Sequence, residues 1–593
     1  MMCDRLMKSM RSISALCCLF LFAVATAAQH KPVDFAELEK TVAAELRENN
    51  TPGAAVVVIS GERVLFMKGF GTTSAEGGAP VTPGTLFRRR PSRRDQFAAI
   101  VDGDRSYRLT LKFSEGRKMK KRLVLSILLT LLASVGQAAT PAVNTTAFVG
   151  VNVIPMDRER VLSNQTVIVR DGVIVEIGDA KKVRVPGDAQ RIDGRGKFLI
   201  PGLTDMHVHL FTDDEFPDAL AEDEFKIMLA QGVTTIRLMN GTPEQLVLRA
   251  RSAKGEIVAP TIYAASPQFI GRKSNHAYVV TNEAEARAAV RKAKTDGYDY
   301  LKMTTFLKPE VYEAIIEEAA RQNIRVVGHA DSRTVGLPRA LKARQQIEHL
   351  DSYLEALLPE NSPVKGSVSD LYIYQPKNWE SLDVLDEKRI PEIARATVQA
   401  NPFSVPTLHL FKSTFGIGRT EESIRLQPDI RFYPQKTVDL WVGYNKKYQA
   451  QWASPERRAR YVSIRNKLVK AIHDAGGKIL AGSDTPEWLL LYGYTLHREL
   501  RALNEAGLSP YATLAAATRN PAEFFGTLDK TGTIERGKRA DLVLLEANPL
   551  AGIANTERRA GVMLKGRWFA QAELDKTLDE IAPRFQHALE EKH

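Results

Sequence analysis

The chain has 593 residues, enough for two or more folding units, and ordinary shares of hydrophobic and charged residues. Its formal net charge is +12, but residues 1–118 carry +6 and residues 119–138 carry +3, which leaves only +3 for the remaining 455 residues. This distribution gives no support to nucleic-acid binding by the main body, and the lack of cysteine after Cys18 excludes disulfides and thiolate ligands there.

Two segments have the pattern of a secretory signal, with a basic start, an apolar run and a small-x-small exit. The first spans residues 1–27 and ends in Ala-Thr-Ala, and the second spans residues 119–138 and ends in Gly-Gln-Ala. The second apolar run is short for a membrane span, so a buried core helix is its alternative. The pattern predicts export, to the periplasm or the medium, with no stable membrane span in the mature protein.

Residues 28–118 separate the two signal-like segments. Their first part predicts a helix and a two-strand meander, and residues 32–88 resemble the opening of serine hydrolases related to class C β-lactamases. In that family the next element carries the nucleophile in S-x-x-K, but here Ser92 is followed by Arg-Arg-Asp. We therefore interpret residues 28–118 as a truncated remnant of such a hydrolase with a frame-shifted linker, and Met119 as the start of the working protein.

Short β elements flank the main body on both sides. Residues 139–201 alternate apolar and polar side chains and turn at Asp-Gly and Gly, and residues 528–593 have the same texture before a C-terminal helix. Because these segments bracket everything between them, we expect one small β-sandwich built from both flanks.

Residues 202–527 alternate apolar strands with helical patterns. Eight strand candidates begin at residues 202, 233, 261, 298, 324, 345, 403 and 478. Strand and helix alternating eight times predicts an α/β fold, a (β/α)8 TIM-like barrel. Two longer segments, about residues 352–400 and 411–462, interrupt the late repeats and are expected to cap the barrel mouth.

Ionisable side chains end five of the predicted strands, where barrel enzymes place their active sites. They are His207 and His209 on the first strand, Lys302 on the fourth, His329 on the fifth, His349 on the sixth and Asp484 on the eighth. Two histidines at i and i+2 on a strand point to one face and can chelate a cation. Taken singly each fits a core role, but together they indicate a metal centre.

Lys302 has two interpretations, because an ammonium inside a barrel loses much of its hydration energy. It forms a salt bridge with Asp484, or it is a neutral amine that adds carbon dioxide and becomes a carbamate bridging two metal ions. Asp484 is correspondingly a helix N-cap, or a metal ligand that accepts a proton from the attacking water.

This residue set, with the tail LHRELRALNEAGLSPYATLAAATRNPAEFFG, resembles the amidohydrolase superfamily with a binuclear centre. The match covers roughly residues 145–570 and is similar to the imidazolonepropionase-like branch, which includes prolidase-type dipeptidases. The resemblance implies two divalent metal ions, one held by His207, His209 and Asp484, the other by His329 and His349, with carbamylated Lys302 as a bridging ligand. Nitrogen and oxygen donors without a redox task favour zinc.

One position departs from the related dipeptidases, which often have tyrosine or histidine two residues after the strand-five histidine. This chain has Asp331 there. His276 and Tyr278, which follow the third strand, are therefore candidates for substrate binding, with an ordinary polar loop as the alternative. His497 matches a family position beyond the eighth strand, and its role stays open.

The resulting prediction is an exported binuclear metal-dependent amidohydrolase that cleaves a C–N amide bond in a dipeptide or an N-acyl amino acid. The alternatives are a cyclic-amide hydrolase or deaminase of the same superfamily, and a metal-binding protein without turnover. Lys302 argues against the mononuclear deaminases, which generally lack it. The expected partner is a small-molecule amide or dipeptide, and the oligomeric state stays open.

Overall fold

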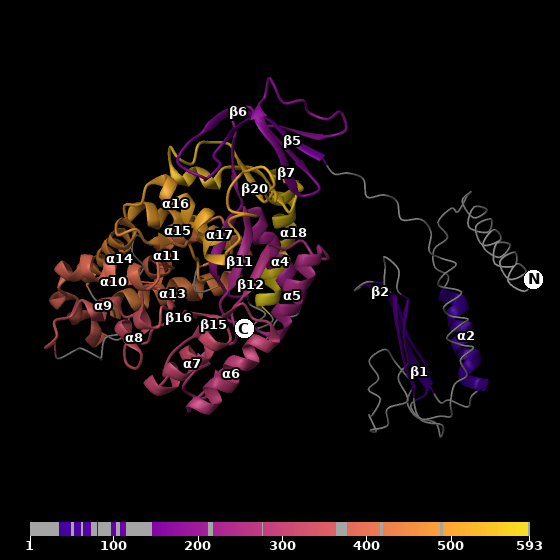
Figure 1. The fold of residues 1–593 in the computed structure, drawn as a ribbon, viewed down its shortest axis with the longest axis horizontal. Coiled ribbons are helices and arrows are strands. Elements are labelled where there is room, and N and C mark those ends of the chain that lie inside the picture. The colour runs from indigo at the N-terminus through magenta and orange to yellow at the C-terminus, as the bar shows by residue number, and fades with distance from the viewer. Residues whose placement is uncertain are drawn as a thin grey trace, which may run out of the picture. The chain divides into compact units, whose positions relative to one another are not determined.

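The computed structural model divides the chain into two compact units, Met1–Ala142 and Val143–His593 (Figure 1). It describes residues 35–48, 53–60, 63–72, 80, 97–101, 107–113, and 145–590 apart from 211–217, 276, 363–375, 415–418, 452–453 and 487–489. Both signal-like segments lie outside the described residues. Among those that are described, no helix combines the length and apolarity needed to cross a lipid bilayer.

The first unit contains the predicted helix and two strands, and two further strands. They are α2 (Phe35–Glu48), β1 (Gly53–Ser60), β2 (Arg63–Gly71), β3 (Phe97–Val101) and β4 (Tyr107–Phe113). All pairs are antiparallel, in the order β2-β1-β4-β3. The strands β3 and β4 fall in the segment interpreted as a frame-shifted linker, so that segment is not without structure. The resemblance to a serine hydrolase stays a prediction.

Strands from both flanks of the second unit share one eight-stranded sheet, in the order β22-β21-β20-β9-β5-β6-β7, with β8 paired to β5. Their bounds are β5 (Thr145–Val153), β6 (Leu162–Arg170), β7 (Val173–Asp179), β8 (Gln190–Asp193), β9 (Phe198–Pro201), β20 (Leu542–Leu545), β21 (Arg559–Leu564) and β22 (Arg567–Ala570). The flanks join where β9 pairs antiparallel with β20. The predicted union of the two flanks is present, and its arrangement as a sandwich stays a prediction.

The predicted Asp-Gly turn lies between β6 and β7. Asp171 and Gly172 both have positive φ, 48° and 79°, which a two-residue hairpin of this hand requires. Across the sheet, the rings of Phe148 and Trp568 meet edge to face with centroids 5.3 Å apart. One apolar core therefore joins the start and the end of this unit.

Each of the eight predicted strand segments contains a parallel strand. They are β10 (Leu203–Val208), β11 (Val233–Leu238), β12 (Thr261–Ala264), β15 (Tyr300–Met303), β16 (Arg325–Gly328), β17 (Gln346–Ile347), β18 (Phe403–Ser404) and β19 (Lys478–Ile479). Two short strands, β13 (Phe269–Ile270) and β14 (Tyr278–Val279), extend the β15 sheet. The paired groups are β10-β11-β12, β15-β16-β17 and β18-β19.

Single parallel bridges connect the three groups. Ala265 pairs with Tyr300, Glu348 with Val405, and Val208 with Thr485. The pairings therefore lead from β10 through β19 and back to β10, the strand order that a (β/α)8 barrel requires. This order gathers the carboxyl ends of all eight strands at one end of the unit.

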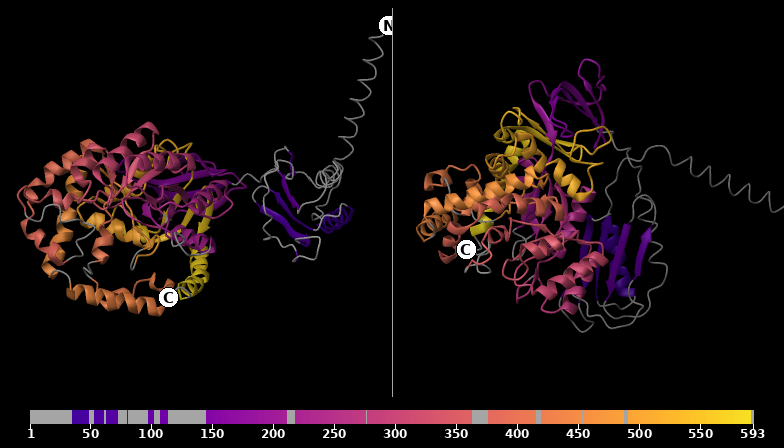
Figure 2. Two further views of the ribbon diagram at one scale, coloured as in Figure 1. Left: turned by 90° about the horizontal axis from the view of Figure 1, so that it is seen from below. Right: turned by 60° about the vertical axis from the view of Figure 1, so that its left-hand side comes forward.

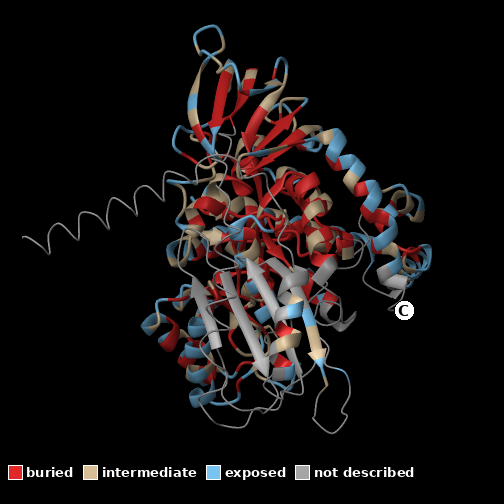
Figure 3. Cartoon of the chain, turned by 90° about the vertical axis from the view of Figure 1, so that its right-hand side faces the viewer, coloured by how far each residue is buried: buried red, intermediate tan, exposed pale blue. Residues whose placement is uncertain are grey.

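Helices lie outside these strands, and the buried residues concentrate in the strands and on the inner helix faces (Figures 2 and 3). Between strands run α4 (Asp218–Ala230), α5 (Pro243–Lys254), α6 (Glu283–Asp296), α7 (Pro309–Arg321), α8 (Gly336–Lys342), α10 (Ile390–Ala400) and α14 (Pro455–Asp474). Local chemistry sets their ends. In α6 the Asn282 side chain accepts from Glu285 N, and Gly297 closes the helix in the left-handed conformation.

The remaining described helices all lie after β17 in the chain. They are α9 (Tyr353–Ala356), η3 (Pro376–Val384), η4 (Glu387–Arg389), α11 (Leu408–Thr414), α12 (Glu421–Arg425), η5 (Ile430–Phe432), α13 (Gln435–Gln451), α15 (Tyr494–Glu505), α16 (Pro510–Ala516), α17 (Arg519–Phe525), η6 (Ile553–Glu557) and α18 (Gln571–Glu590). The segment expected to be an insertion over residues 352–400 ends in α10. That helix buries Ile390, Ile393 and Ala394 in the main core, so its residues are core and not cap.

We expect residues 143–593 to fold without residues 1–142, because their sheets and cores are built from their own residues alone. The shortened chain should unfold cooperatively at the melting temperature shown by the same transition in the full chain. Calorimetry of both forms measures this. A shortened chain without a cooperative transition would show that the first unit is needed for folding.

Candidate metal centre

The end of β10 brings His207 and His209 beside the segment that follows β19. Asp484 N donates to His207 O at 2.8 Å, and His209 N donates to Thr485 O at 2.6 Å. Gly482 permits this approach, since a Cβ added there would lie 2.9 Å from the His207 Cβ. The backbone pairing thus carries the Asp484 carboxylate to the two imidazoles.

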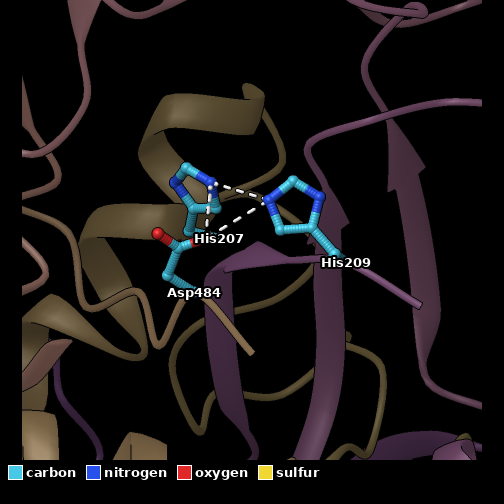
Figure 4. A group of neighbouring side chains, drawn as sticks. All are labelled: His207, His209 and Asp484. Carbon is cyan, nitrogen blue, oxygen red and sulfur yellow. Dashed lines mark hydrogen bonds and ion pairs between the residues drawn. The ribbon is translucent and has the colours of Figure 1, made fainter. Parts of the chain in front are cut away.

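The three side chains form a compact triangle (Figure 4). The two Nε2 atoms are 3.3 Å apart, and each lies 3.2 Å from Asp484 Oδ1. In a tetrahedral zinc site with bonds of about 2.0–2.1 Å, neighbouring ligand atoms are about 3.3–3.4 Å apart. The triangle of His207, His209 and Asp484 therefore fits one divalent cation.

The protonation states also suit a cation. Burial, with the charge of Lys302 among its neighbours, holds the pKa of His207 well below its usual value. Burial disfavours the Asp484 carboxylate, but the surrounding His207, His209 and Lys302 lower its pKa below the ordinary range. A neutral imidazole and an ionised carboxylate are the forms that bind metals.

His349 and His329 continue the cluster from the triangle. The His349 ring lies 4.7 Å from that of His207 and 4.9 Å from that of His329, centroid to centroid. His349 Nε2 is 3.8 Å from Asp484 Oδ2, the carboxylate oxygen that does not face the triangle. The structure therefore brings four predicted histidines and Asp484 together. Burial also lowers the pKa of His349 well below its usual value.

Lys302 lies on β15, which pairs with β16. Its side chain is buried, and Nζ has no hydrogen-bond partner among the described residues. Burial lowers its pKa, against the opposing charges of Glu348 and Asp484. The salt bridge to Asp484, one of its two interpretations, is not formed. Gly328 makes room for its stem, because an added Cβ would lie 3.0 Å from Lys302 Cδ.

Three of the histidines are held through Nδ1, which leaves Nε2 free for a metal. His207 Nδ1 lies 2.7 Å from Glu348 Oε2, His329 Nδ1 lies 2.7 Å from Asp351 Oδ2, and His349 Nδ1 lies 2.8 Å from Thr407 Oγ1. Such outer partners fix the ring orientation and the tautomer in metal sites. Both carboxylates follow β17, and Thr407 follows β18.

Glu348 is the most enclosed of these partners. It is 0% exposed and accepts from Arg237 Nη2 at 2.5 Å as well as contacting His207. Arg237, also 0% exposed, donates to Met206 O and Gln346 Oε1, both at 2.7 Å. Neither residue was among the predicted site residues. The available signal was a charge inside an apolar strand pattern, in VTTIRLM and QQIEHL.

The position of Tyr278 gives no support to its predicted role in substrate binding, and the predicted role of His276 stays a prediction. His276 lies outside the described residues. Tyr278, on β14, is partly buried against Phe269, and its hydroxyl donates to Asp296 Oδ2 of α6 at 3.4 Å. Asp331, at the position that departs from related dipeptidases, is buried and pairs with Arg333. Asp331 therefore does not supply a free polar group.

Comparison with known proteins gives a consistent result. A model described as the amidohydrolase family matches residues 198–569. Enamidase of Eubacterium barkeri is 22% identical over 395 residues, 66% of this chain and 84% of that protein. The structure of a bottromycin amidohydrolase has a TM-score of 0.56 at 21% identity, covering 74% of this chain and 90% of that one. A Xaa-Pro dipeptidase structure with bound methionine has a TM-score of 0.50 at 20% identity, covering 72% and 100%. The structural likeness concerns the fold alone, and it implies a TIM-like barrel.

Replacing Glu348 tests the outer partner of His207. Glu348→Gln removes the charge that faces Arg237 and leaves one acceptor oxygen for two donors, Arg237 Nη2 and His207 Nδ1, so we expect metal affinity to fall about 10–100-fold. Competition against a chromogenic chelator measures it, with circular dichroism to verify folding. Glu310→Gln, at an exposed position of α7, is the control for the charge change. Equal metal affinity in Glu348→Gln and wild type would contradict this role.

Proposed function

The chain belongs to the amidohydrolase family and is a hydrolase of C–N bonds, and we propose that it is an exported binuclear enzyme that cleaves the amide bond of a dipeptide or an N-acyl amino acid. The eight parallel strands within residues 202–527 are proposed to close as its barrel. Residues 139–201 and 528–593 are proposed to form the sandwich beside it. The observation that carries the proposal is the triangle of His207, His209 and Asp484, whose spacing fits one divalent cation.

A first metal ion is assigned to this triangle and a second to His329 and His349, with carbamylated Lys302 between them. The second pair is supported by the stacking of the two rings, 4.9 Å apart, and by the anchoring of both Nδ1 atoms. Nitrogen and oxygen donors without cysteine favour zinc. Two such cations lower the pKa of a bound water and polarise the substrate carbonyl.

The carbamate rests on the environment of Lys302. Its amine is buried, unpaired among the described residues, and shifted toward the neutral form. A neutral amine is the form that adds carbon dioxide, and the product is an anion with two oxygens. Asp484 is the one carboxylate of the triangle that fits a metal ion. The negative charge of the carbamate would therefore help to balance the charge of the two metal ions.

Asp484 is assigned a second task, to take a proton from the attacking water and return it to the leaving amine. Its two oxygens face different groups: Oδ1 lies toward His207 and His209, and Oδ2 toward His349. Asp484 also has a positive φ of 57°, a sparsely populated backbone conformation of the kind that clusters at active sites. A carboxylate between both halves of the cluster is well placed for proton transfer.

The substrate class is inferred from the chemistry of the family and the names of the neighbours. The names of the Xaa-Pro dipeptidase, the bottromycin amidohydrolase and the enamidase all refer to an amide or a dipeptide. Export rests on the two signal-like segments, residues 1–27 and 119–138. Since these lie outside the described residues, detection of the mature N-terminus in the periplasm or medium is its test.

Replacing Lys302 tests the bridging ligand. Lys302→Ala should lose the paired metals and reduce activity by more than about 100-fold, beyond the effect of an outer partner. Short carboxylic acids such as acetate should partly restore activity, because they fit the space left by the side chain. Lys302→Met fills that space and should not be rescued, and Lys292→Ala, at an exposed position of α6, is the control. Full activity of Lys302→Ala with two bound metals would eliminate the carbamate.

Metal dependence and substrate class are tested together with a substrate panel. Zinc-loaded protein should hydrolyse Xaa-Pro dipeptides or N-acyl amino acids, lose activity with a chelator, and regain it with zinc. Amine release is followed by chromatography, with ring-opening of cyclic amides and ammonia release from amino-heterocycles measured in parallel. Turnover of cyclic amides or amino-heterocycles alone would reassign the enzyme within the family. Stoichiometric metal without any turnover would favour a binding protein.

A further inference from the structure

A cavity of about 610 Å³ lies apart from the metal centre. It is lined by residues of α11, α12, α15, η6 and α18, and none of the six predicted metal ligands lines it. Its volume falls in the range of small-molecule sites, about 300–1,000 Å³. The cavity therefore has the size of a ligand site but no part in the proposed hydrolysis.

Six cations line this cavity, and four of them have a carboxylate partner. The ion pairs are Lys412 with Glu505 at 2.5 Å, Arg431 with Asp579 at 2.6 Å, Arg498 with Asp429 at 2.5 Å, and Arg501 with Glu557 at 2.7 Å. The other two, Arg419 and Arg559, form no ion pair within the described ranges. Both guanidinium groups therefore lack a described carboxylate within ion-pair distance, although Asp429 attracts Arg419 from farther away.

Arg419 has few contacts for a group so enclosed. Its Nη2 lies 3.4 Å from His409 Nε2, while Nη1 is buried and has no hydrogen-bond partner in the part of the chain that is described. Burial, and then repulsion from Arg498, lower its pKa to about 10, so the guanidinium stays charged at neutral pH. A buried, charged donor of this kind is stabilised by an acceptor that bears negative charge.

Arg559 lies at another part of the same wall, and its acceptors are neutral. Nε donates to Ala230 O at 2.9 Å and Nη2 to Gln231 Oε1 at 2.7 Å, while Nη1 lies 3.2 Å from His497 Nε2. Asp575 also lines the cavity, where it accepts from Gln571 Nε2, but no ion pair joins it to Arg559 among the described side chains. Arg559 therefore forms its hydrogen bonds with neutral groups, while Glu557 and Asp575 attract it from beyond ion-pair distance.

The two histidines of the wall are neutral and add no charge to it. Burial first, and the neighbouring arginines second, hold the pKa of His409 well below its usual value and lower that of His497 to about 3. On α15, Arg498 and Arg501 follow His497 and lie on one face of the helix. Six cations and three carboxylates, Glu505, Glu557 and Asp575, line the cavity, so positive charge is in excess there.

We propose that this cavity binds a small anion with a carboxylate or phosphate group, held by Arg419 and Arg559. Planar guanidinium groups bind both oxyanions through paired hydrogen bonds, and the unpartnered Nη1 of Arg419 supplies such a donor. The anion would complete the charge pairing that the other four cations obtain from glutamate and aspartate. The site is independent of the metal ligands and of the hydrolytic activity.

Calorimetric titration of the metal-loaded full chain with inorganic phosphate and with succinate tests the site, at constant ionic strength. We expect saturable binding with one equivalent of at least one probe, and the preferred probe distinguishes phosphate from carboxylate. Arg419→Gln should weaken that binding about tenfold or more, the loss expected for a charged hydrogen-bond pair. Arg425→Gln, on α12, is the matched control, because Arg425 already pairs with Glu421 and Asp439 and does not line the cavity.

Arg559→Gln is a second variant, with thermal unfolding used to verify that it folds. If it does not fold, Arg419→Gln and its control decide the question alone. No saturable binding of either probe would overturn the proposal, as would equal binding by wild type and Arg419→Gln. Because the readout is heat of binding, failure here leaves the hydrolytic function untouched, and an inactive protein that binds phosphate would still support the cavity.

Discussion

The second unit depends on one buried ion pair, Glu348 with Arg237. Both side chains are 0% exposed, and the pair joins three strands, since Arg237 lies on β11, Glu348 follows β17, and His207 lies on β10. Burying two charges is unfavourable unless every donor and acceptor is satisfied. Here Arg237 also bonds Met206 O and Gln346 Oε1, while Glu348 also holds His207. The pair therefore fixes the core of the unit and the candidate ligand His207 in one network.

The metal centre follows from that constraint. With Nδ1 of His207 bound to Glu348, Nε2 is the nitrogen left to meet His209 and Asp484. Asp351 and Thr407 hold His329 and His349 in the same way. The rings of His207 and His349 thus lie against one carboxylate, in the kind of pre-organised arrangement that metal sites use.

Alternation along strands and the position of strand ends suffice to predict the six ligand candidates, because both depend only on local sequence. Glu348 and Arg237 were not predicted, since their pairing depends on which strands meet across the unit. The role of Tyr278 depends equally on packing, and its hydroxyl points to Asp296. The strands β3 and β4 were overlooked because an abrupt change of composition was interpreted as a linker. Pairing between distant segments is the part that a single sequence does not reveal.

The positive charges of three buried side chains are compensated in different ways. Arg237 is neutralised by Glu348 within the fold. Lys302 has no described partner for Nζ, and a lysine, unlike an arginine, can lose its proton and react, so the proposed carbamate would remove its positive charge. Arg419 retains its charge, with His409 as its hydrogen-bond partner and with Arg498 and Asp429 acting on it from farther away. Because a guanidinium neither deprotonates at neutral pH nor forms a carbamate readily, the partner that we propose for its buried Nη1 is an anion from outside the chain.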